Sequence, residues 1–174
     1  SIFGVTLLTG CGEELDHNKI RQNGFVYCGQ GGPTSFNPQL VDSGITSETL
    51  SPQLFDTLLT LDSNNFKPIP NLATSWSVNK AGTEYTFNLR KGVKFQKTAW
   101  FTPKRPMNAE DVVFSFRRII DSSHPYHYVG SGLYPWFSGI DFQNLLIDVK
   151  AISEYQVRFT LSRPDNTFLS NIAT

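Results

Sequence analysis

Strict alternation of apolar and polar residues marks the expected strands of this chain. Residues 84–89, 147–152 and 156–161 each alternate in this way. A period of two residues predicts half-buried antiparallel strands. Only three residues separate the last two stretches, which predicts a hairpin. A second hairpin is predicted earlier in the chain, because Trp76 and Val78 continue the alternation just before a Lys-Ala-Gly turn.

A spacing of three to four residues between apolar side chains predicts a helix over residues 47–60. Leu50 and Leu54 lie on one face of this helix, and Ser47 can cap its first turn. The ten residues that follow are rich in turn-forming types. Residues 71–76 are expected to form one helical turn that leads into the first hairpin.

The clearest helical pattern covers residues 109–121. Asn108 is a favourable cap, and two acidic residues follow it in the first turn, where the helix dipole stabilises negative charge. The apolar stripe consists of Val112, Val113, Phe116, Ile119 and Ile120. Residues 122–139 are rich in Gly, Ser, Pro and aromatic side chains, so we expect a long ordered loop or a short helix there. A last helix is predicted to begin at residues 163–165.

Residues 1–23 are interpreted as a cropped export signal followed by a polar tether. Residues 1–11 are apolar but too short to cross a bilayer, which takes about 20 apolar residues. They therefore match the end of a secretory hydrophobic region. Leu8-Thr-Gly-Cys11 resembles the lipobox of bacterial lipoproteins, which implies a lipid on Cys11 and attachment to a membrane. In the alternative interpretation this is a short strand in which the cysteine is incidental.

Composition and charge narrow the function classes. The chain has 15 basic and 15 acidic residues, and 13% of its residues are aromatic, which is unlike a disordered protein. A formal charge of zero does not suggest nucleic acid as a partner. One cluster is locally basic and carries aromatic residues: Arg90, Lys91, Lys94, Phe95, Lys97, Trp100, Phe101, Lys104 and Arg105. We interpret it as a solvated face whose aromatic residues belong to the core, rather than as a site for single-stranded nucleic acid.

No motif for catalysis, phosphate binding or zinc binding is present in the sequence. His124 and His127 form the only close histidine pair. A proline lies between them, and no cysteine or carboxylate follows closely, so we interpret them as loop residues rather than metal ligands. We therefore expect neither an enzyme nor a bound cofactor.

Five segments in a fixed order carry a family resemblance: Ser35–Gln39, Leu72–Trp76, Tyr85–Phe95, Met107–Phe116 and Asp165–Leu169. They resemble the extracytoplasmic solute-binding proteins of peptide ABC importers, the dipeptide- and oligopeptide-binding family 5. Residues 23–28 and 95–103 are most similar to members linked to antimicrobial-peptide resistance. The resemblance implies an α+β fold, with a mixed β-sheet and packed helices, that forms the N-terminal part of a two-lobed periplasmic binding protein (class II, cluster C-like).

The resemblance also implies a division of the chain. Residues 24–46 would supply the first strand and a pocket loop of lobe I, residues 47–174 a small α+β subdomain of that lobe, and the second lobe would be absent. In dipeptide-binding members the cysteine that corresponds to Cys28 forms a disulfide, so its partner is expected outside this chain.

Two loops are expected to line the ligand pocket, because the corresponding loops do so in relatives. They give the candidate ligand-binding residues Val41, Ser43, Gly44, Ile45, Thr46, Tyr128, Ser131 and Tyr134. Glycine allows a ligand to approach the backbone closely. For each of these residues the alternative role is turn formation or packing.

The resemblance implies a periplasmic receptor that binds peptides and delivers them to an ABC permease, and the lipobox-like motif at Cys11 implies that it is anchored as a lipoprotein. Two alternatives are carried forward. One is a haem- or nickel-binding receptor of the same family, for which His124 and His127 would be suitable ligands. The other is a secreted hydrolase, which would need a nucleophile and base that the sequence does not offer at a recognisable spacing.

Overall fold

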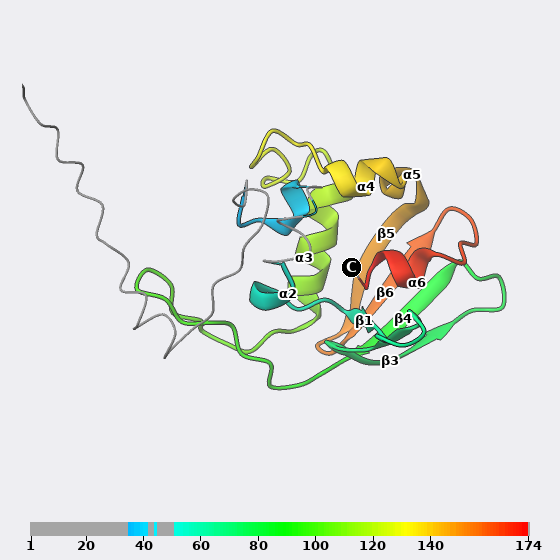
Figure 1. Cartoon of the computed structure of the whole chain (residues 1–174), viewed down its shortest axis with the longest axis horizontal. Coiled ribbons are helices and arrows are strands. Elements are labelled where there is room, and N and C mark those ends of the chain that lie inside the picture. The colour runs from blue at the N-terminus through cyan, green and yellow to red at the C-terminus, as the bar shows by residue number, and fades with distance from the viewer. Residues whose placement is uncertain (1–34, 42–43, 45–50, 174) are drawn as a thin grey trace, which may run out of the picture. The chain divides into compact units, whose positions relative to one another are not determined.

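The centre of the fold is a four-stranded antiparallel sheet built from two hairpins. The computed structural model describes residues 35–41, 44 and 51–173, which all belong to one compact unit of residues 32–174. In spatial order the strands are β3 (Ala73–Val78), β4 (Glu84–Leu89), β6 (Gln156–Leu161) and β5 (Leu146–Ser153). The two inner strands, β4 and β6, join the hairpins (Figure 1). Both predicted hairpins are confirmed.

One face of the sheet is covered by helix α3 (Ala109–Ile120), which packs along β5 and β6 (Figure 1). The alternation in β4 places Tyr85, Phe87 and Leu89 in the core, as the sequence predicts. Phe87 contacts Phe159 of β6 edge to face, with ring centroids 5.4 Å apart. Large apolar side chains of both sheet and helices thus form one core, which also includes Ile119, Tyr134, Phe142, Val149, Val157 and Phe168.

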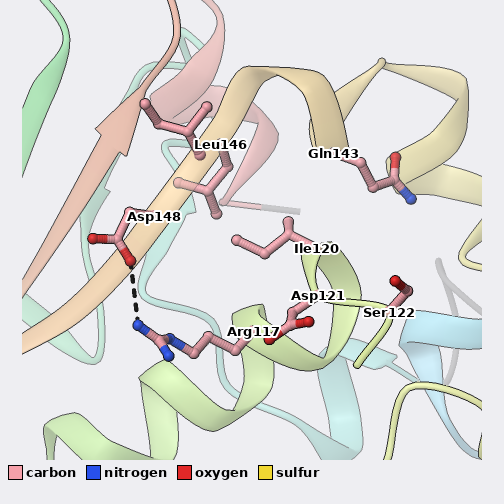
Figure 2. Close-up of a pocket in the computed structure, with 8 residues that line it drawn as sticks. Arg117, Ile120, Asp121, Ser122, Gln143, Leu146 and Asp148 are labelled. Carbon is pink, nitrogen blue, oxygen red and sulfur yellow. Dashed lines mark hydrogen bonds and ion pairs between the residues drawn. The ribbon is translucent and has the colours of Figure 1, made fainter. Parts of the chain in front are cut away.

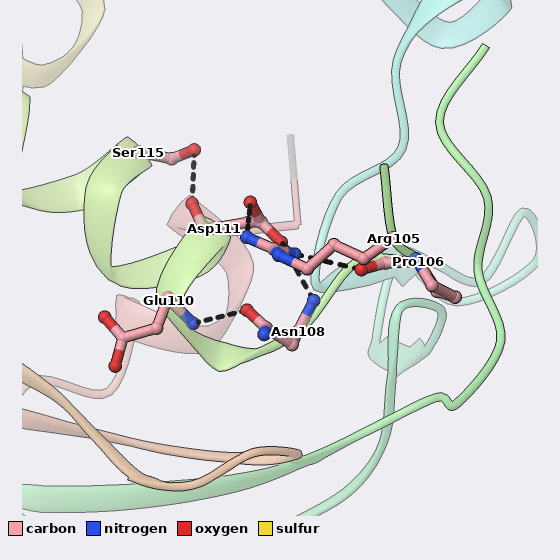
Figure 3. Close-up of polar contacts among 6 residues, drawn as sticks. All are labelled: Arg105, Pro106, Asn108, Glu110, Asp111 and Ser115. Atoms are coloured by element: carbon pink, nitrogen blue, oxygen red, sulfur yellow. Dashed lines mark hydrogen bonds and ion pairs between the residues drawn. The ribbon is translucent and has the colours of Figure 1, made fainter. Parts of the chain in front are cut away.

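Helix α3 begins at a reciprocal capping arrangement (Figure 3). The side chain of Asn108 accepts a hydrogen bond from the backbone N–H of Glu110 at 3.0 Å. The carboxylate of Asp111 accepts one from the backbone N–H of Asn108 at 2.9 Å. Arg105 adds two charged contacts to this carboxylate, at 2.6 and 3.0 Å. The first turn of α3 is therefore tied to the segment that precedes it, and backbone donors that a helix start leaves free are satisfied.

The charge on Asp111 is expected to make the stability of α3 depend on pH. Partial burial by itself raises the pKa of Asp111, but Arg105 and the N–H of Asn108 outweigh it and lower that pKa below the ordinary value. A lowered pKa in the folded state contributes stability above about pH 4, and this stability is lost as the pH falls through the folded pKa. Asp111→Asn should lower the free energy of unfolding at pH 7 by about 1–2 kcal/mol.

Urea unfolding at pH 7 and at pH 3 measures this contribution. The gap between wild type and Asp111→Asn should shrink at the lower pH, because the carboxylate of unfolded wild-type chains is then largely protonated, which favours unfolding. Glu110→Gln is the matched control in the same turn, since the side chain of Glu110 is exposed; it should change the free energy of unfolding by less than about 0.5 kcal/mol. If Glu110→Gln lowered the free energy of unfolding as much as Asp111→Asn, with the same pH dependence, the capping role of Asp111 would be contradicted.

The predicted helix over residues 47–60 is wrong in its second half. Helix α2 (Ser51–Leu54) ends at Leu54, and β1 (Leu59–Leu61) pairs with β2 (Pro68–Pro70) as a small antiparallel sheet. Leu58 and Leu59 are buried, and the carbonyl of Leu58 accepts a hydrogen bond from Ala73. The apolar spacing therefore reflects burial against the segment that leads into β3, which only the tertiary structure supplies.

The helical turn predicted for residues 71–76 is also wrong. Ala73–Val78 form strand β3, which pairs with β4 from Val78 opposite Tyr85 to Ala73 opposite Leu89 and has an irregularity between Ala73 and Ser75. Pairing with a strongly apolar neighbouring strand overrides the weak local preference for a turn.

The remaining helices are short. They are the 3₁₀ helix η1 (Pro38–Leu40), α4 (Pro135–Gly139), α5 (Phe142–Leu145) and α6 (Phe168–Asn171). The α+β class is confirmed. The predicted last helix is present, but it begins at Phe168 and not at residues 163–165. The sequence analysis expected a mixed sheet, which contains both parallel and antiparallel strand pairs. Every strand pair among the described residues is antiparallel. The strand expected at the start of residues 24–46 lies outside the described residues.

In the described ranges, no helix has the length and apolar character needed to cross a membrane.

Candidate functional site

The loop that follows α3 is fixed to the end of that helix by hydrogen bonds. The hydroxyl of Tyr134 donates to the carbonyl of His127 at 2.8 Å and accepts from Nε of Arg118 at 3.4 Å. Nδ1 of His127 lies 2.7 Å from the carbonyl oxygen of Arg118, so Nδ1 is the protonated nitrogen and donates to it. The Arg118 guanidinium also lies over the Tyr134 ring, 5.8 Å from its centroid. The buried Tyr134 side chain thus holds the loop against the end of α3 through these contacts.

The tip of this loop has an unusual backbone. Gly130, Ser131 and Gly132 are consecutive and have φ values of +104°, +70° and +71°. Non-glycine residues rarely adopt such values, and strained backbone of this kind is concentrated at functional sites. The backbone N–H of Ser131 donates to the carbonyl of Tyr128 at 3.2 Å. The sharp turn leaves the Tyr128 side chain 66% exposed.

Segment 35–41 packs against this loop although some 90 residues separate them in sequence. A Cβ added at Gly130 would lie 2.3 Å from Cδ1 of Leu40, so the Leu40 side chain lies directly on the glycine backbone. Gln39 donates from Nε2 to the carbonyl of Ser115 in α3 at 3.2 Å, and η1 also contacts α4. Figure 1 shows η1 beside the loop and the end of α3. The segment directly before the predicted pocket loop of residues 41–46 therefore packs against the loop after α3.

The structure separates the predicted site residues by exposure. Gly44, Tyr128 and Ser131 are exposed, and Val41 is half-buried directly after η1. Tyr134 is fully buried, so its position favours the packing role over contact with a ligand. Several other predicted residues lie outside the described residues: Cys11, Cys28, Ser43, Ile45 and Thr46.

Sequence reasoning missed two residues that assemble this surface, Leu40 and Gly130. The sequence Gly-Ser-Gly is a local signal for left-handed backbone and could have drawn attention to Gly130. Leu40 has no such signal, because its importance comes only from a contact with a distant part of the chain.

The two histidines of the loop belong to different clusters. The ring of His124 lies against Phe114 (centroids 5.1 Å apart), and its Nδ1 accepts a hydrogen bond from the backbone N–H of Tyr126. The ring of His127 contacts those of Tyr128 and Tyr134. Across residues 35–41, 44 and 51–173, no group of three His, Cys, Asp or Glu side chains could hold a metal ion.

A separate hollow opens between the C-terminal end of α3 and the start of β5 (Figure 2). Its charged groups already have partners within the fold. Arg117 contacts Asp148 at 3.3 Å and the carbonyl of Val149 at 3.2 Å, and Lys150 contacts Asp148 at 2.7 Å. Burial tends to raise the pKa of Asp148, but these two cations lower it below its ordinary value. The hollow contains none of the predicted site residues and offers a ligand little unsatisfied charge.

Comparison with known proteins gives the family. The model described as bacterial extracellular solute-binding proteins, family 5 Middle, matches residues 67–174. The chain belongs to this family. The match to the family model covers β2 to α6, including the whole four-stranded sheet. The family resemblance inferred from the sequence motifs is therefore confirmed.

Individual family 5 proteins are similar over most of the chain. It is 45% identical to Peptide transport periplasmic protein SapA of Salmonella typhimurium over 93% of its residues. It is 43% identical to Heme-binding protein A of Haemophilus influenzae over 86%. A crystal structure of a dipeptide binding protein from Pseudoalteromonas sp. SM9913 in complex with Met-Leu matches with a TM-score of 0.82, at 43% identity over 85% of the chain. The chain spans 30%, 27% and 29% of these three proteins, respectively.

Proposed function

We propose that this family 5 chain is part of the substrate-binding component of an ABC importer and that its ligand is a peptide. The observation that carries the proposal is the 45% identity to a peptide transport protein over nearly the whole chain. The structural match to a dipeptide binding protein in complex with Met-Leu supports the same ligand class. The proposal includes antimicrobial peptides among its cargoes.

In this proposal the surface built by η1 and the loop after α3 forms one wall of the peptide pocket. In this proposal Tyr128 and Ser131 contact the ligand from the loop, and Val41 and Gly44 contact it from the η1 side. Ser43, Ile45 and Thr46 are proposed to belong to the same binding surface. Tyr134 acts indirectly by positioning the loop. The opposite wall would come from a second lobe that closes over the peptide, with backbone groups binding the main chain of the ligand.

The proposal places the protein in the periplasm, where it would pass peptide to the permease in the inner membrane. A lipid on Cys11 would hold it at the membrane, and Cys28 would form a disulfide with a cysteine outside this chain. We propose no catalytic activity, since the similar proteins named above are transport or binding proteins.

Peptide titration of the full-length protein, followed by calorimetry, tests this function. Tyr128→Ala should raise the Kd for a bound dipeptide such as Met-Leu about tenfold, because an exposed aromatic side chain would be covered on binding. Tyr126→Ala is the matched control: Tyr126 is similarly exposed but packs with Phe114 and His124 instead, and it should change Kd less than twofold. If no di-, tri- or oligopeptide binds the wild-type protein, the proposed function is wrong.

One observation favours haem as a second candidate ligand. Because Nδ1 of His127 donates to a backbone carbonyl, its Nε2 is left as the nitrogen able to bind a metal. Histidine ligands are commonly oriented by such a hydrogen bond. Haem titration of the full-length protein should then produce a sharp absorbance band that His127→Gln abolishes and His124→Gln leaves in place. Unchanged spectra on titration would eliminate this candidate.

A further inference from the structure

A long loop between β4 and α3 is closed at its base and has an ordered tip. The backbone N–H of Met107 donates to the carbonyl of Val93 at 2.8 Å, which closes the base. At the tip, the N–H of Thr98 donates to the carbonyl of Phe101 at 2.9 Å. The N–H of Phe101 donates back to the Thr98 hydroxyl at 3.0 Å. Residues 93–107 therefore form a defined projection that leaves the sheet and returns to α3, drawn in green in Figure 1.

The aromatic residues of this loop do not belong to the core, contrary to the interpretation made from the sequence. Trp100 is 87% exposed, Phe101 50% and Phe95 42%. Trp100 lies inside the tip turn, and Phe101 closes it. Large aromatic side chains of this kind are usually buried or occupied by a partner, so the tip has the composition of a contact surface.

The same loop carries a concentrated positive charge. Residues 85–109 contain six basic side chains and no acidic one. Three of the six have partners in the fold: Arg105 pairs with Asp111, Arg90 donates to the carbonyl of Asn71, and Lys91 lies over the ring of Tyr155.

The other three basic residues, Lys94, Lys97 and Lys104, flank the aromatic tip and are exposed. In the part of the chain that the structure describes, none of them contacts a carboxylate. Within the described residues, their charge is therefore left for an anionic partner.

We propose that this loop docks on the surface of an anionic phospholipid membrane. Trp100 and Phe101 enter the headgroup region, and the three lysines contact lipid phosphates. Tryptophan prefers the interface between membrane and water, and each nearby lysine adds attraction to an anionic surface. A projecting tip fits a membrane better than it fits single-stranded nucleic acid, which is held in grooves.

Sedimentation with vesicles tests the proposal on the full-length protein, with Cys11→Ser in every sample so that no lipid anchor contributes. The protein should bind vesicles of phosphatidylglycerol at low ionic strength and bind vesicles of phosphatidylcholine at least tenfold more weakly. Replacing Lys94, Lys97 and Lys104 with Gln should weaken binding about fivefold per lysine at low salt. Lys67→Gln/Lys80→Gln, at exposed sites away from the loop, should change it less than twofold.

Tryptophan quenching by brominated lipid separates insertion of the tip from a charge interaction alone. The chain has three tryptophans, and Trp100→Phe should remove most of the quenching while the protein still binds. Trp136→Phe, the control, should leave it intact. Failure to bind anionic vesicles would overturn the proposal. Binding without quenching of Trp100 would also overturn it and would point to an acidic protein surface as the partner. Neither outcome depends on whether the protein binds peptides.

Discussion

Phe159→Ala is expected to lower the free energy of unfolding by about 3–5 kcal/mol. The Phe159 side chain is fully buried on β6. Its ring centroid lies 4.8 Å from that of Phe116 in α3, 5.4 Å from that of Phe87 in β4 and 5.8 Å from that of Phe168 in α6. Truncation would leave a cavity where sheet and helices meet, and these rings cannot collapse into it without moving the elements that carry them.

Urea unfolding measures this loss. Phe159→Leu keeps most of the volume and should cost less, about 1–2 kcal/mol. Phe95→Ala, at an exposed site of the same residue type, should change the free energy of unfolding by less than about 0.5 kcal/mol. Similar losses at Phe159 and Phe95 would mean that the aromatic core is not organised as described.

Gly130→Ala should lower the free energy of unfolding by about 2–4 kcal/mol, through two additive causes. The φ value of +104° at Gly130 costs a non-glycine residue about 1–3 kcal/mol. The new methyl group would also lie 2.3 Å from Cδ1 of Leu40, a distance at which one of the two must move. Leu40, which would have to move, belongs to η1. If this surface is a wall of the peptide pocket, peptide affinity should therefore fall together with stability.

Two variants separate the causes. Gly92→Ala also places alanine at a positive φ, +73°, but nothing lies within 4 Å of its Cβ, so it should cost only about 1–2 kcal/mol. The double variant Gly130→Ala/Leu40→Ala relieves the clash and should cost less than the sum of its two single changes. Thermal unfolding with paired peptide titration measures both effects. Simple additivity would show that Leu40 does not contact Gly130.

Periodicity located β4, β5, β6 and the long helix α3 well, because each of these elements buries one face in a continuous layer, but it missed β1, β2 and the start of β3. The alternating apolar residues of β4 and β6 form the sheet side of the core, and the apolar stripe of α3 forms its helix side. Periodicity failed between residues 55 and 61, where Leu58 and Leu59 are buried next to a distant strand rather than along a helix. Apolar spacing reports that side chains are buried, but not which neighbour buries them.

The candidate site was predictable only in part. The family resemblance indicated two loops, at residues 41–46 and after α3, and the structure packs Leu40, directly before the first loop, against Gly130 of the second. It also shows that Tyr134, chosen with the exposed Tyr128, is a buried support for the loop. Two tyrosines six residues apart in a loop have no local feature that distinguishes these roles, because exposure depends on how the chain turns at residues 130–132.

The sequence by itself determined the α+β class, both hairpins of the main sheet, helix α3 with its cap and the family. Each of these follows from local patterning or from motifs with a fixed order. The tertiary structure alone decided that β1 replaces the end of a predicted helix, that η1 lies on Gly130, and that Trp100 is exposed beside three lysines without acidic partners in the described part of the chain. These features depend on contacts between residues far apart in sequence, or on the absence of such contacts, and no local pattern encodes either.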